Sequence, residues 1–497
     1  MALPENEKAS IDDIKKILKY IAKGYKVDPV IYDTIRKVTV KEVEEKNRVV
    51  LYKRDPNVER GRIQGAYVKI IDGETIAVHP SAVGGFGADF DGDQMALVAP
   101  ISLEAQKEVK DKMITTQSFE RINAPNFTLS KEMNIGIYTI TFLENTDKKP
   151  VLVNSVEDAK KLHIGDPVKF NSNIGMINTT AGRVIFNSVL PSYIPFVNRE
   201  VNSKAVNKIL SDVMTKSKTD FARSIDALCK MGFEYATMYP QTISLDMFIV
   251  PENLKKLATQ LSKEPDVLKQ VEIINTMEVQ LKEHLRKNVP CLHIQIESGA
   301  AKGGSQIRQI MVAKGLINNA VGELLPPISK ALNDGYTPEE YFEASAGSRK
   351  GIIDKAINTA FGGYAYRKMV YGTGSTESDI TNADCGTKRG IKLKLDNDLF
   401  SRMSGRYVFN EKTRKIERLT QEHVGKLIEI RSPIFCKSRK ICRICYGDLI
   451  YQVQSRNAGL LASQACASLS EKIMKCSTGL VEIEGESISL DELWNKV

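Results

Sequence analysis

The sequence lacks the features that would place it in a membrane or outside the cell. No uninterrupted apolar run in its 497 residues approaches the roughly 20 that a membrane-spanning helix needs. The N-terminal stretch MALPENEKASIDDIKK has no apolar core of the kind that signal peptides carry. We therefore expect a cytoplasmic protein with no membrane partner.

Cysteine is scarce, and neither sign of charge dominates. Eight cysteines in 497 residues are too few for a disulfide scaffold, and in a reducing compartment clustered cysteines are more often metal ligands. The 70 basic and 61 acidic residues leave a formal charge of +9, which permits a nucleic-acid partner without demanding one. The length suggests about three domains.

The pattern of apolar residues predicts an α+β, multidomain chain. Helical spacing, short β-rich pieces (NRVVLYK, AYVKIID and ETIAVHP) and turn signals alternate along it, and a strand pair is expected around AGRVIFNSVLP, residues 181–191. In chain order we expect a charged helical segment (1–47), a small barrel or compact sheet (48–102), a mixed region (103–336), one long helix (337–372), a loop-rich region with four cysteines (373–455), and a helix with an acidic tail (456–497).

The start of the long helix carries the strongest local signal. Thr337, Pro338 and Glu340 provide a capping hydroxyl, a proline at the first helical position and a glutamate three residues after the cap. A helix from there to about Tyr371 would be about 50 Å long. The pair Gly362-Gly363 is a weak point where it could bend.

The stretch ADFDGDQMA, residues 88–96, places carboxylates at every second position. Like charges so close are costly unless a cation lies between them. A calcium-binding EF-hand loop would need glycine at position 6 and glutamate at 12, where this loop has Gln94 and Pro100. Two interpretations remain, a polar turn between strands or a magnesium site with open positions for substrate, and we favour magnesium.

The same stretch carries a family resemblance. It matches without a gap the signature NADFDGDQMA of the largest, β′-type subunit of multisubunit DNA-dependent RNA polymerases. Further blocks resemble that family in the same order, from about residue 48 to about residue 476. They include KRDPNVERGRIQ, TTAGRVIFNSVLP, IESGAAKGGSQIRQI and SRKGIIDKAINTAFGGYAYRK.

The resemblance implies names for the expected segments. Residues 48–102 would form a double-psi β-barrel with the metal-A loop, and 103–336 a secondary-channel or pore region. Residues 337–372 would be the bridge helix, 373–455 a zinc-binding region, and 456–497 a partial trigger-loop region and tail.

Four cysteines agree with the expected zinc-binding region. Cys436, Cys442 and Cys445 are close to a zinc-knuckle spacing, and Cys385 in ADCGT supplies a fourth thiolate at the position of the family's first ligand. Four soft ligands suit one closed, tetrahedral, structural zinc ion. The alternative is that these are ordinary thiols.

The resemblance also implies roles for individual residues. Asp89, Asp91 and Asp93 would be catalytic and hold one magnesium ion, and a second would arrive with the nucleoside triphosphate. Substrate contacts are expected from Arg54, Arg308, Met474 and Lys475. Nucleic-acid contacts are expected from Arg349, Lys350, Thr359, Ala360, Gly363, Arg367 and Lys368. Each has a plainer alternative: a salt bridge for Arg54, a packing face for the small residues, and a solvated helix face for the basic ones.

The sequence departs from the family at two sites. Gly87 stands where the family has an asparagine thought to recognise the ribose hydroxyl, so Arg54 alone would bear that task. No histidine can be placed at the family's trigger-loop position, where Ser477 or Thr478 falls. Lys302 is one position away from a basic residue of the family.

Taken together, the resemblance implies a catalytic β′ fragment of a DNA-dependent RNA polymerase. Its expected partners are a β-type chain with the second barrel, the remaining β′ pieces, a promoter-specificity factor, DNA template, RNA product and nucleoside triphosphates. Such split, divergent subunits are typical of jumbo bacteriophages, which would place the enzyme in the host cytoplasm or in the virion. Two alternatives stay open, an RNA-templated two-barrel polymerase and a non-catalytic zinc-bearing nucleic-acid scaffold.

Overall fold

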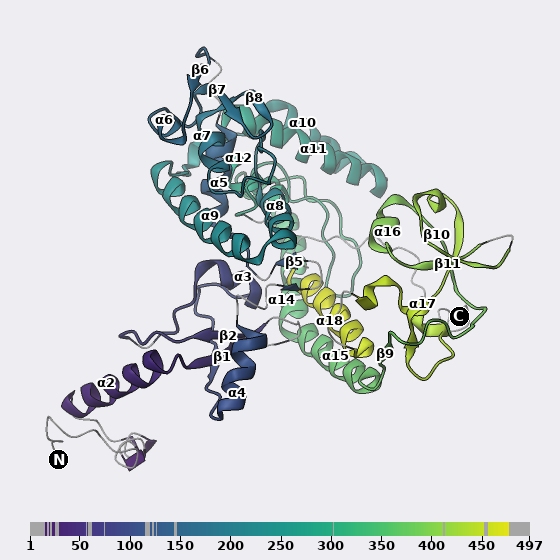
Figure 1. Ribbon diagram of the computed structural model, residues 1–497. Helices are drawn as coiled ribbons and strands as arrows, with labels where there is room; N and C mark the ends of the chain where they lie inside the picture. Colours follow the sequence, from purple (N-terminus) through teal and green to yellow (C-terminus); the bar gives the residue numbers. More distant parts are fainter. Residues whose placement is uncertain are drawn as a thin grey trace. The chain divides into compact units, whose positions relative to one another are not determined.

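The chain folds into two compact units. The computed structural model describes residues 15–16, 19, 22–24, 29–55, 57, 62–73, 75–114, 120–121, 124–125, 127–143, 147–301, 303–410, 413–451 and 456–476. The first unit comprises residues 1–257 and 271–311, and the second comprises 258–270 and 312–497 (Figure 1). Within the described residues, no helix is long and apolar enough to span a membrane.

The first unit begins with a helix and a small sheet. Helix α2 spans Pro29–Glu45 and confirms part of the helical prediction, most of whose earlier residues lie outside those described. Strand β1 (Val49–Lys53) lies between β2 (Ile63–Tyr67) and β3 (Ala96–Val98), antiparallel to both. The double-psi barrel stays a prediction, since the described strands form an antiparallel three-stranded sheet.

The third expected β-rich piece, ETIAVHP (74–80), differs from the prediction. Its described residues form a loop that leads into a 3₁₀ turn at Pro80–Ala82. The turn is capped by His79, whose Nδ1 accepts a hydrogen bond of 3.3 Å from the Ser81 amide. Proline favours the first position of such a turn and lacks the donor that a strand would need.

Most of the first unit is a helical core. Helices α5 (Glu132–Phe142) and α9 (Lys218–Met238) cross in close contact, because a Cβ on Gly136 would lie 1.9 Å from the Gly232 carbonyl oxygen. Ile137 and Phe221 are fully buried there. A sheet of order β6-β7-β8 adjoins these helices, with β6 at Val151–Val153, β7 at Pro167–Ser172 and β8 at Gly175–Thr180.

The prediction of a strand pair around 181–191 is wrong. The antiparallel pair is β7 and β8, which ends at Thr180, and Ala181–Asn187 form helix α7 instead. The Thr180 hydroxyl caps this helix by accepting a 3.3 Å hydrogen bond from the Arg183 amide. The β-branched and aromatic residues of the run are buried in the helical core, and this tertiary burial outweighs their preference for strands.

The remaining elements around the first unit are mostly helical. They are α3 (Val83–Phe86), α4 (Leu103–Glu108), a π turn (Val109–Met113), β4 (Glu120–Arg121), β5 (Ala124–Pro125), α6 (Val156–Lys160), α8 (Ser203–Lys216), a 3₁₀ turn (Leu245–Phe248), α10 (Glu252–Lys263), α11 (Val267–Asn288), α12 (Pro290–Glu297) and α13 (Gly303–Met311).

The second unit is built on the long helix that the sequence predicts. Helix α14 spans Pro338–Ile353, a π turn covers Asp354–Asn358, and α15 continues over Thr359–Thr373. The capping box is confirmed: the Glu340 amide donates to the Thr337 hydroxyl (3.2 Å), and the Thr337 amide donates to the Glu340 carboxylate (3.1 Å). The departure from regular α-helix falls at the π turn, before Gly362-Gly363.

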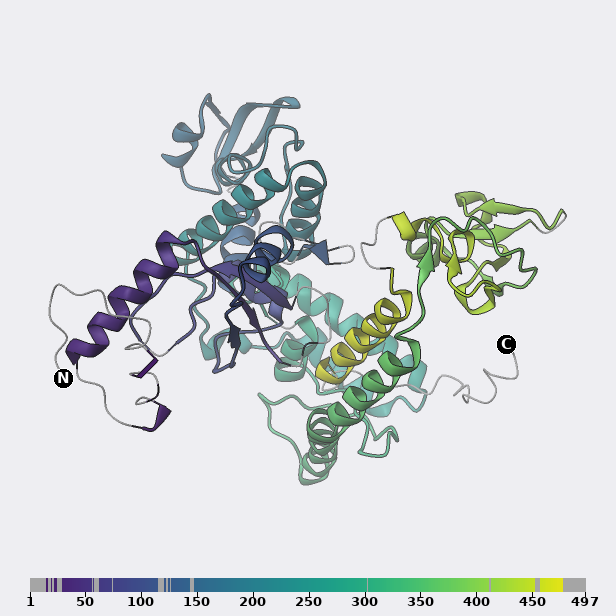
Figure 2. The same cartoon turned by 60° about the horizontal axis from the view of Figure 1, so that its bottom comes forward.

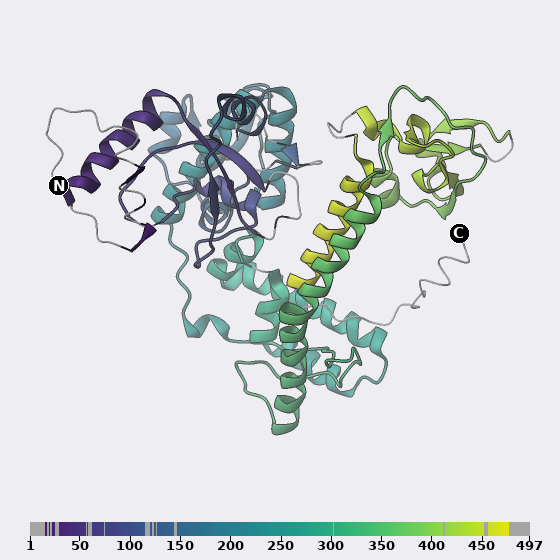
Figure 3. The same cartoon turned by 90° about the horizontal axis from the view of Figure 1, so that it is seen from below.

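Helix α18 (Ala458–Cys476) lies side by side with α15 in Figure 3. The contact is very close at its first turn, because a Cβ on Gly459 would lie 1.9 Å from the Thr373 carbonyl oxygen. The hydroxyls of Thr373 and Ser463 are 2.9 Å apart, and the Asn457 side-chain amide donates to the Gly374 carbonyl. Small and polar residues therefore join the start of α18 to the end of α15.

A lobe joined to the end of α15 and the start of α18 (Figure 2) contains four of the eight cysteines: Cys385, Cys436, Cys442 and Cys445. Its four-stranded sheet has the order β10-β13-β11-β12 and packs around buried Leu395, Val408 and Ile428. The elements are β9 (Ser378–Asp379), β10 (Ile391–Lys394), α16 (Asn397–Arg402), β11 (Tyr407–Phe409), β12 (Ile416–Arg418), a 3₁₀ turn (Gln421–His423), β13 (Leu427–Ile430), a 3₁₀ turn (Pro433–Phe435), β14 (Ile441–Cys442), α17 (Arg443–Tyr446) and a 3₁₀ turn (Asp448–Tyr451).

Candidate active site and cysteine cluster

The aspartate loop is anchored at its start by a buried ring. Helix α3 ends with Phe86, which is fully buried and lies 4.8 Å from the ring of Tyr52, measured between centroids. Gly87 follows in the left-handed conformation (φ 60°, ψ 31°), and Gly92 has φ 114°. Both conformations favour glycine, and they let the chain turn twice within a few residues.

The two turns gather the three carboxylates. One carboxylate oxygen from each of Asp89, Asp91 and Asp93 lies within 4.8 Å of the others. The Asp89 amide donates to Asp93 Oδ2 at 3.0 Å, which closes the loop on itself. The structure therefore brings together the three residues that the sequence assigned to magnesium.

Two cations flank the triad. Arg54, at the end of β1, contacts Asp93 through Nη2 to Oδ1 and through Nε to Oδ2, each at 2.9 Å. The two side chains are only 19% and 21% exposed. Lys131 Nζ lies 3.9 Å from Asp89 Oδ2. Asp93 is thus held by a bidentate pair, a geometry that fixes the orientation of a carboxylate.

The neighbouring carboxylates act on the ionisation of Asp91. A hydrogen bond with Asp89 and the negative charges of Asp89 and Asp93 raise the pKa of Asp91 above its usual range. Like charges resist joint ionisation, and a divalent cation between them relieves the repulsion. Oxygen ligands at this spacing therefore fit a hard cation such as magnesium.

Lys131 is a site residue that sequence reasoning missed. It lies at the N-cap of α5, far from the loop in sequence, and its backbone has φ 48° and ψ −122°. Residues other than glycine rarely adopt those backbone angles, and backbone strain of this kind is concentrated at functional sites. Nothing in the local sequence signals either the strain or the approach to Asp89.

A pocket of about 490 Å³ opens beside the triad. Asp89 and Asp93 line it together with apolar side chains that include Val83, Phe86 and Met95. The carboxylates thus border a space lined by both polar and apolar side chains, which suits a ligand that has both a charged group and a ring.

Gly87, where the family has an asparagine, lies beside the Arg62 guanidinium. A Cβ built on Gly87 would lie 3.8 Å from the nearest atoms of the Arg62 guanidinium, which is ordinary contact. The left-handed conformation is one that asparagine tolerates better than most residues. The site could therefore accommodate the asparagine that the family resemblance leads one to expect.

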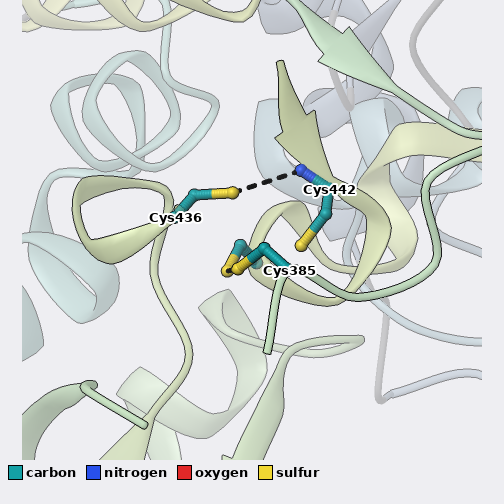
Figure 4. Close-up of side chains that lie close together, drawn as sticks. Cys385, Cys436 and Cys442 are labelled. Carbon is teal, nitrogen blue, oxygen red and sulfur yellow. Dashed lines mark hydrogen bonds between the residues drawn. The ribbon is translucent and has the colours of Figure 1, made fainter. Parts of the chain in front are cut away.

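The four cysteines assigned to zinc converge. Cys385 comes from a loop after β9, Cys436 follows a 3₁₀ turn, and Cys442 and Cys445 lie in β14 and α17. Their sulfur atoms lie within 4.8 Å of one another, and Figure 4 shows labelled members of the cluster turned toward a common centre. The Cys442 amide donates to Cys436 Sγ at 3.4 Å.

The spacing and the electrostatics fit a metal. The Cys385 and Cys445 sulfurs are 3.7 Å apart, close to the roughly 3.8 Å that tetrahedral Zn–S bonds of about 2.3 Å impose. Burial opposes ionisation of Cys385, but the backbone amides of Lys437 and Thr387 outweigh it and lower its pKa to about 6. Burial raises the pKa of Cys445. A closed four-thiolate site is the arrangement of structural zinc.

The expected nucleic-acid residues lie on α14, the π turn and α15. Arg349, Thr359, Ala360, Gly363, Arg367 and Lys368 are exposed, and Lys350 is half-buried. Ala360, Gly363 and Arg367 follow at spacings of three and four and so share one helix face. Arg367 lies over the Tyr371 ring (5.3 Å) and Lys368 over the Tyr364 ring (4.6 Å). Cations stacked on exposed rings are a common nucleic-acid-binding surface.

Of the other residues expected to contact substrate, Arg308 is buried in an ion pair. Arg308 is only 7% exposed, and its Nε contacts Glu278 Oε1 at 3.1 Å, so it is held in an ion pair. Met474 and Lys475 belong to helix α18, but their side chains lie outside the described part of the chain, as do Lys302, Ser477 and Thr478. The roles of these residues stay predictions.

Two segments of the chain, one near each end, match family models of the same RNA polymerase subunit. Residues 6–115 match the model "RNA polymerase Rpb1, domain 2", and residues 335–467 match "RNA polymerase Rpb1, domain 5". The first match contains the aspartate loop, and the second contains the long helix and the four cysteines. The aspartate triad and the cysteine cluster thus lie in segments that match two domain models of the same kind of polymerase subunit.

Curated relatives cover the region between the two matches as well. A DNA-directed RNA polymerase subunit β′ of Caldanaerobacter subterraneus is 27% identical over 88% of this chain and 43% of its own length. The subunit of a Sulfurihydrogenibium species is 28% identical over 92% of the chain and 33% of its own length.

The β′ subunit of a Nocardioides species is 28% identical over 84% of the chain and 38% of its own length. The chain therefore spans about two fifths or less of the length of these relatives. Over most of its length the chain is similar to β′ subunits of DNA-directed RNA polymerase.

Proposed function

We propose that this chain carries the catalytic loop of a multisubunit DNA-dependent RNA polymerase and takes part in template-directed nucleotidyl transfer. The observation that carries the proposal is the convergence of Asp89, Asp91 and Asp93 on one centre beside a pocket. It is supported by the match of the same residues to a polymerase domain.

The reaction would join the RNA 3′ hydroxyl to the α-phosphorus of a nucleoside triphosphate and release pyrophosphate. Magnesium, held by the aspartates, would supply the positive charge that lowers the pKa of the hydroxyl and neutralises the reacting phosphate, in a two-metal arrangement. Arg54 fixes Asp93, and Gly92 gives the loop its turn. The protein's share of catalysis is then positioning, because the carboxylates are held before substrate binds.

The other parts of the chain would serve the same reaction. We propose that residues 48–102 complete a double-psi barrel, that 103–336 form a secondary-channel region, and that 337–372 act as a bridge helix against template and product. Residues 373–455 would hold one structural zinc, and 456–497 would contribute part of a trigger region. The exposed Arg367 and Lys368, stacked on tyrosine rings, support the bridge-helix role.

The whole enzyme would need further chains. A β-type chain with the second barrel, the rest of β′, and a promoter-specificity factor are the proposed partners, and we infer that the chain alone is inactive. Divergence to 27–28% identity and the glycine at position 87 support a phage-encoded, split subunit, in the host cytoplasm or the virion.

Purification of the tagged chain with its natural partners tests the proposal. We expect polymerase subunits to co-purify and the complex to extend RNA on a DNA template with magnesium. Extension on RNA but not DNA templates would favour an RNA-templated polymerase. Absence of extension from a complex that binds nucleic acid would favour a non-catalytic scaffold.

A further inference from the structure

A completely buried arginine lies against the cysteine cluster. Arg431 follows strand β13, and its side chain is 0% exposed. Its Nη2 donates to Cys445 Sγ at 3.2 Å and to Cys385 Sγ at 3.4 Å. The same nitrogen donates to Asp384 Oδ1 at 2.5 Å. Two of the four sulfurs therefore share one cationic nitrogen.

The remaining guanidinium nitrogens make the burial costly. Nε and Nη1 of Arg431 are buried and have no hydrogen-bond partner among the described residues. Burying a cation with unpaired donors costs several kcal/mol unless opposite charge compensates it. Further negative charge beside Arg431 would reduce this cost.

Asp384 does not supply all of that charge. Its side chain is 34% exposed, and it also accepts from the Gly386 amide at 3.1 Å. Four thiolates around a divalent zinc ion carry a net charge of −2, and two of them, Cys385 and Cys445, are the other acceptors that Nη2 contacts. In this arrangement Asp384 orients the Arg431 guanidinium, and the thiolates compensate its positive charge.

We propose that Arg431 is a positioning residue of the zinc site, which holds the Cys385 and Cys445 thiolates through N–H···S hydrogen bonds and retains the metal. This inference rests on the proposed zinc site. A hydrogen bond to a thiolate draws electron density from the sulfur, so it weakens the attack of that sulfur on electrophiles. It also offsets the repulsion among four buried thiolates.

The chain offers a matched control in Arg414. Like Arg431, Arg414 forms an ion pair; its partner is Glu429. Both guanidinium groups lie over the Phe409 ring, with the guanidinium carbon 4.6 Å from the ring centroid for Arg414 and 5.6 Å for Arg431. Among the described residues its hydrogen bonds go to Glu429 and to the Lys388 carbonyl, and neither involves sulfur. Substitution at Arg414 therefore perturbs the same lobe without removing an N–H···S bond.

The test uses the full chain, purified with its partners. Zinc content is measured first, because a wild-type chain without zinc would refute the zinc site itself and leave nothing for Arg431 to position. With zinc present, we expect R431Q to release the metal to a chromogenic chelator about tenfold faster than wild type, and R414Q to release it at the wild-type rate. Equal release from R431Q and wild type, or equal acceleration by R414Q, would overturn the inference.

Cobalt substitution adds a reading that general loosening of the lobe would not give. The sulfur-to-cobalt charge-transfer band reports electron density on the thiolates, so loss of the N–H···S bonds should shift it to lower energy in R431Q. R431K, which keeps a cation with donors, should shift it less. If R431Q does not fold, D384N supplies the comparison, because it releases Arg431 from its anchor and should shift the band in part. An unshifted band in these variants contradicts the role of Arg431.

Discussion

Arg54 and Asp93 form a bidentate pair at the edge of the aspartate triad, with Nη2 to Oδ1 and Nε to Oδ2 both at 2.9 Å. The pair joins the end of the central strand to the last carboxylate of the loop. Asp93 Oδ2 also accepts from the Asp89 amide, so the loop and the strand are held together at one side chain. Arg54 therefore determines the orientation of a proposed metal ligand.

Substitution of Arg54 should reduce catalysis even when the positive charge is kept. Lysine cannot reproduce the planar, two-point contact with a carboxylate. We expect R54K to lower the extension rate of the assembled enzyme by about tenfold, since one charge-assisted hydrogen bond contributes about 1.5 kcal/mol or more. Single-nucleotide extension kinetics measure this, and R48K, whose parent residue pairs with Glu42, serves as the control. A rate for R54K equal to wild type would show that the pair has no catalytic part.

Restoring the asparagine at position 87 should sharpen sugar selectivity. The left-handed backbone accepts asparagine, and the nearest atoms to the new Cβ lie at 3.8 Å, so G87N should fold. We expect G87N to raise the preference for ribonucleotides over deoxyribonucleotides, because the amide adds a hydrogen-bonding group beside the pocket. Competitive incorporation assays measure the ratio.

The companion variant R54A should lower the same ratio if Arg54 bears the task alone. Undiminished selectivity in R54A would contradict that hypothesis. An unchanged ratio in G87N would show that position 87 does not face the sugar.

The backbone at Lys131 should be strained in a way that glycine relieves. A side chain at φ 48° and ψ −122° costs of order 1–3 kcal/mol, and glycine loses some of that gain through its freer unfolded chain. We expect K131G to raise the free energy of unfolding by about 1 kcal/mol. K131A, which loses the same ammonium and keeps the strain, should not. Denaturant midpoints compare the two, and equal midpoints would mean that the strain is absent.

An ion pair in the first unit should give a pH-dependent stability. The Lys148 ammonium, 2.8 Å from the Asp166 carboxylate, lowers the pKa of Asp166. A lowered pKa in the folded state contributes stability above the unfolded value of about 3.9, and this is lost as pH falls through the folded value. K148M should therefore be less stable than wild type by about 0.5 kcal/mol near neutral pH. Thermal unfolding should show the difference shrinking below about pH 4, whereas a constant difference would assign it to packing.

The sequence predicted the parts that depend on local chemistry. The capping box at Thr337 depends on residues within one turn, and the aspartate triad and three of the four cysteines (Cys436, Cys442 and Cys445) each lie within a short segment. Such features survive whatever surrounds them, and the structure confirms the cap and the convergence of both sets of side chains.

What the sequence could not predict depends on tertiary contacts. The run AGRVIF has strand-forming residues, but burial and the Thr180 cap make it a helix. Lys131 reaches Asp89, and Arg431 reaches the cysteines, only because the fold brings distant segments together. The local pattern of residues does not predict either contact, because the two partners lie far apart in the sequence.

The most direct test of the central proposal is extension by the assembled enzyme with D91N. Asp91 is exposed, so an amide of the same shape should leave folding unchanged while it removes one charge of the triad. If the three aspartates hold the catalytic metal, we expect D91N to lower magnesium-dependent extension on a DNA template by about a thousandfold. Extension by D91N at the wild-type rate would contradict the assignment of this loop as the catalytic centre.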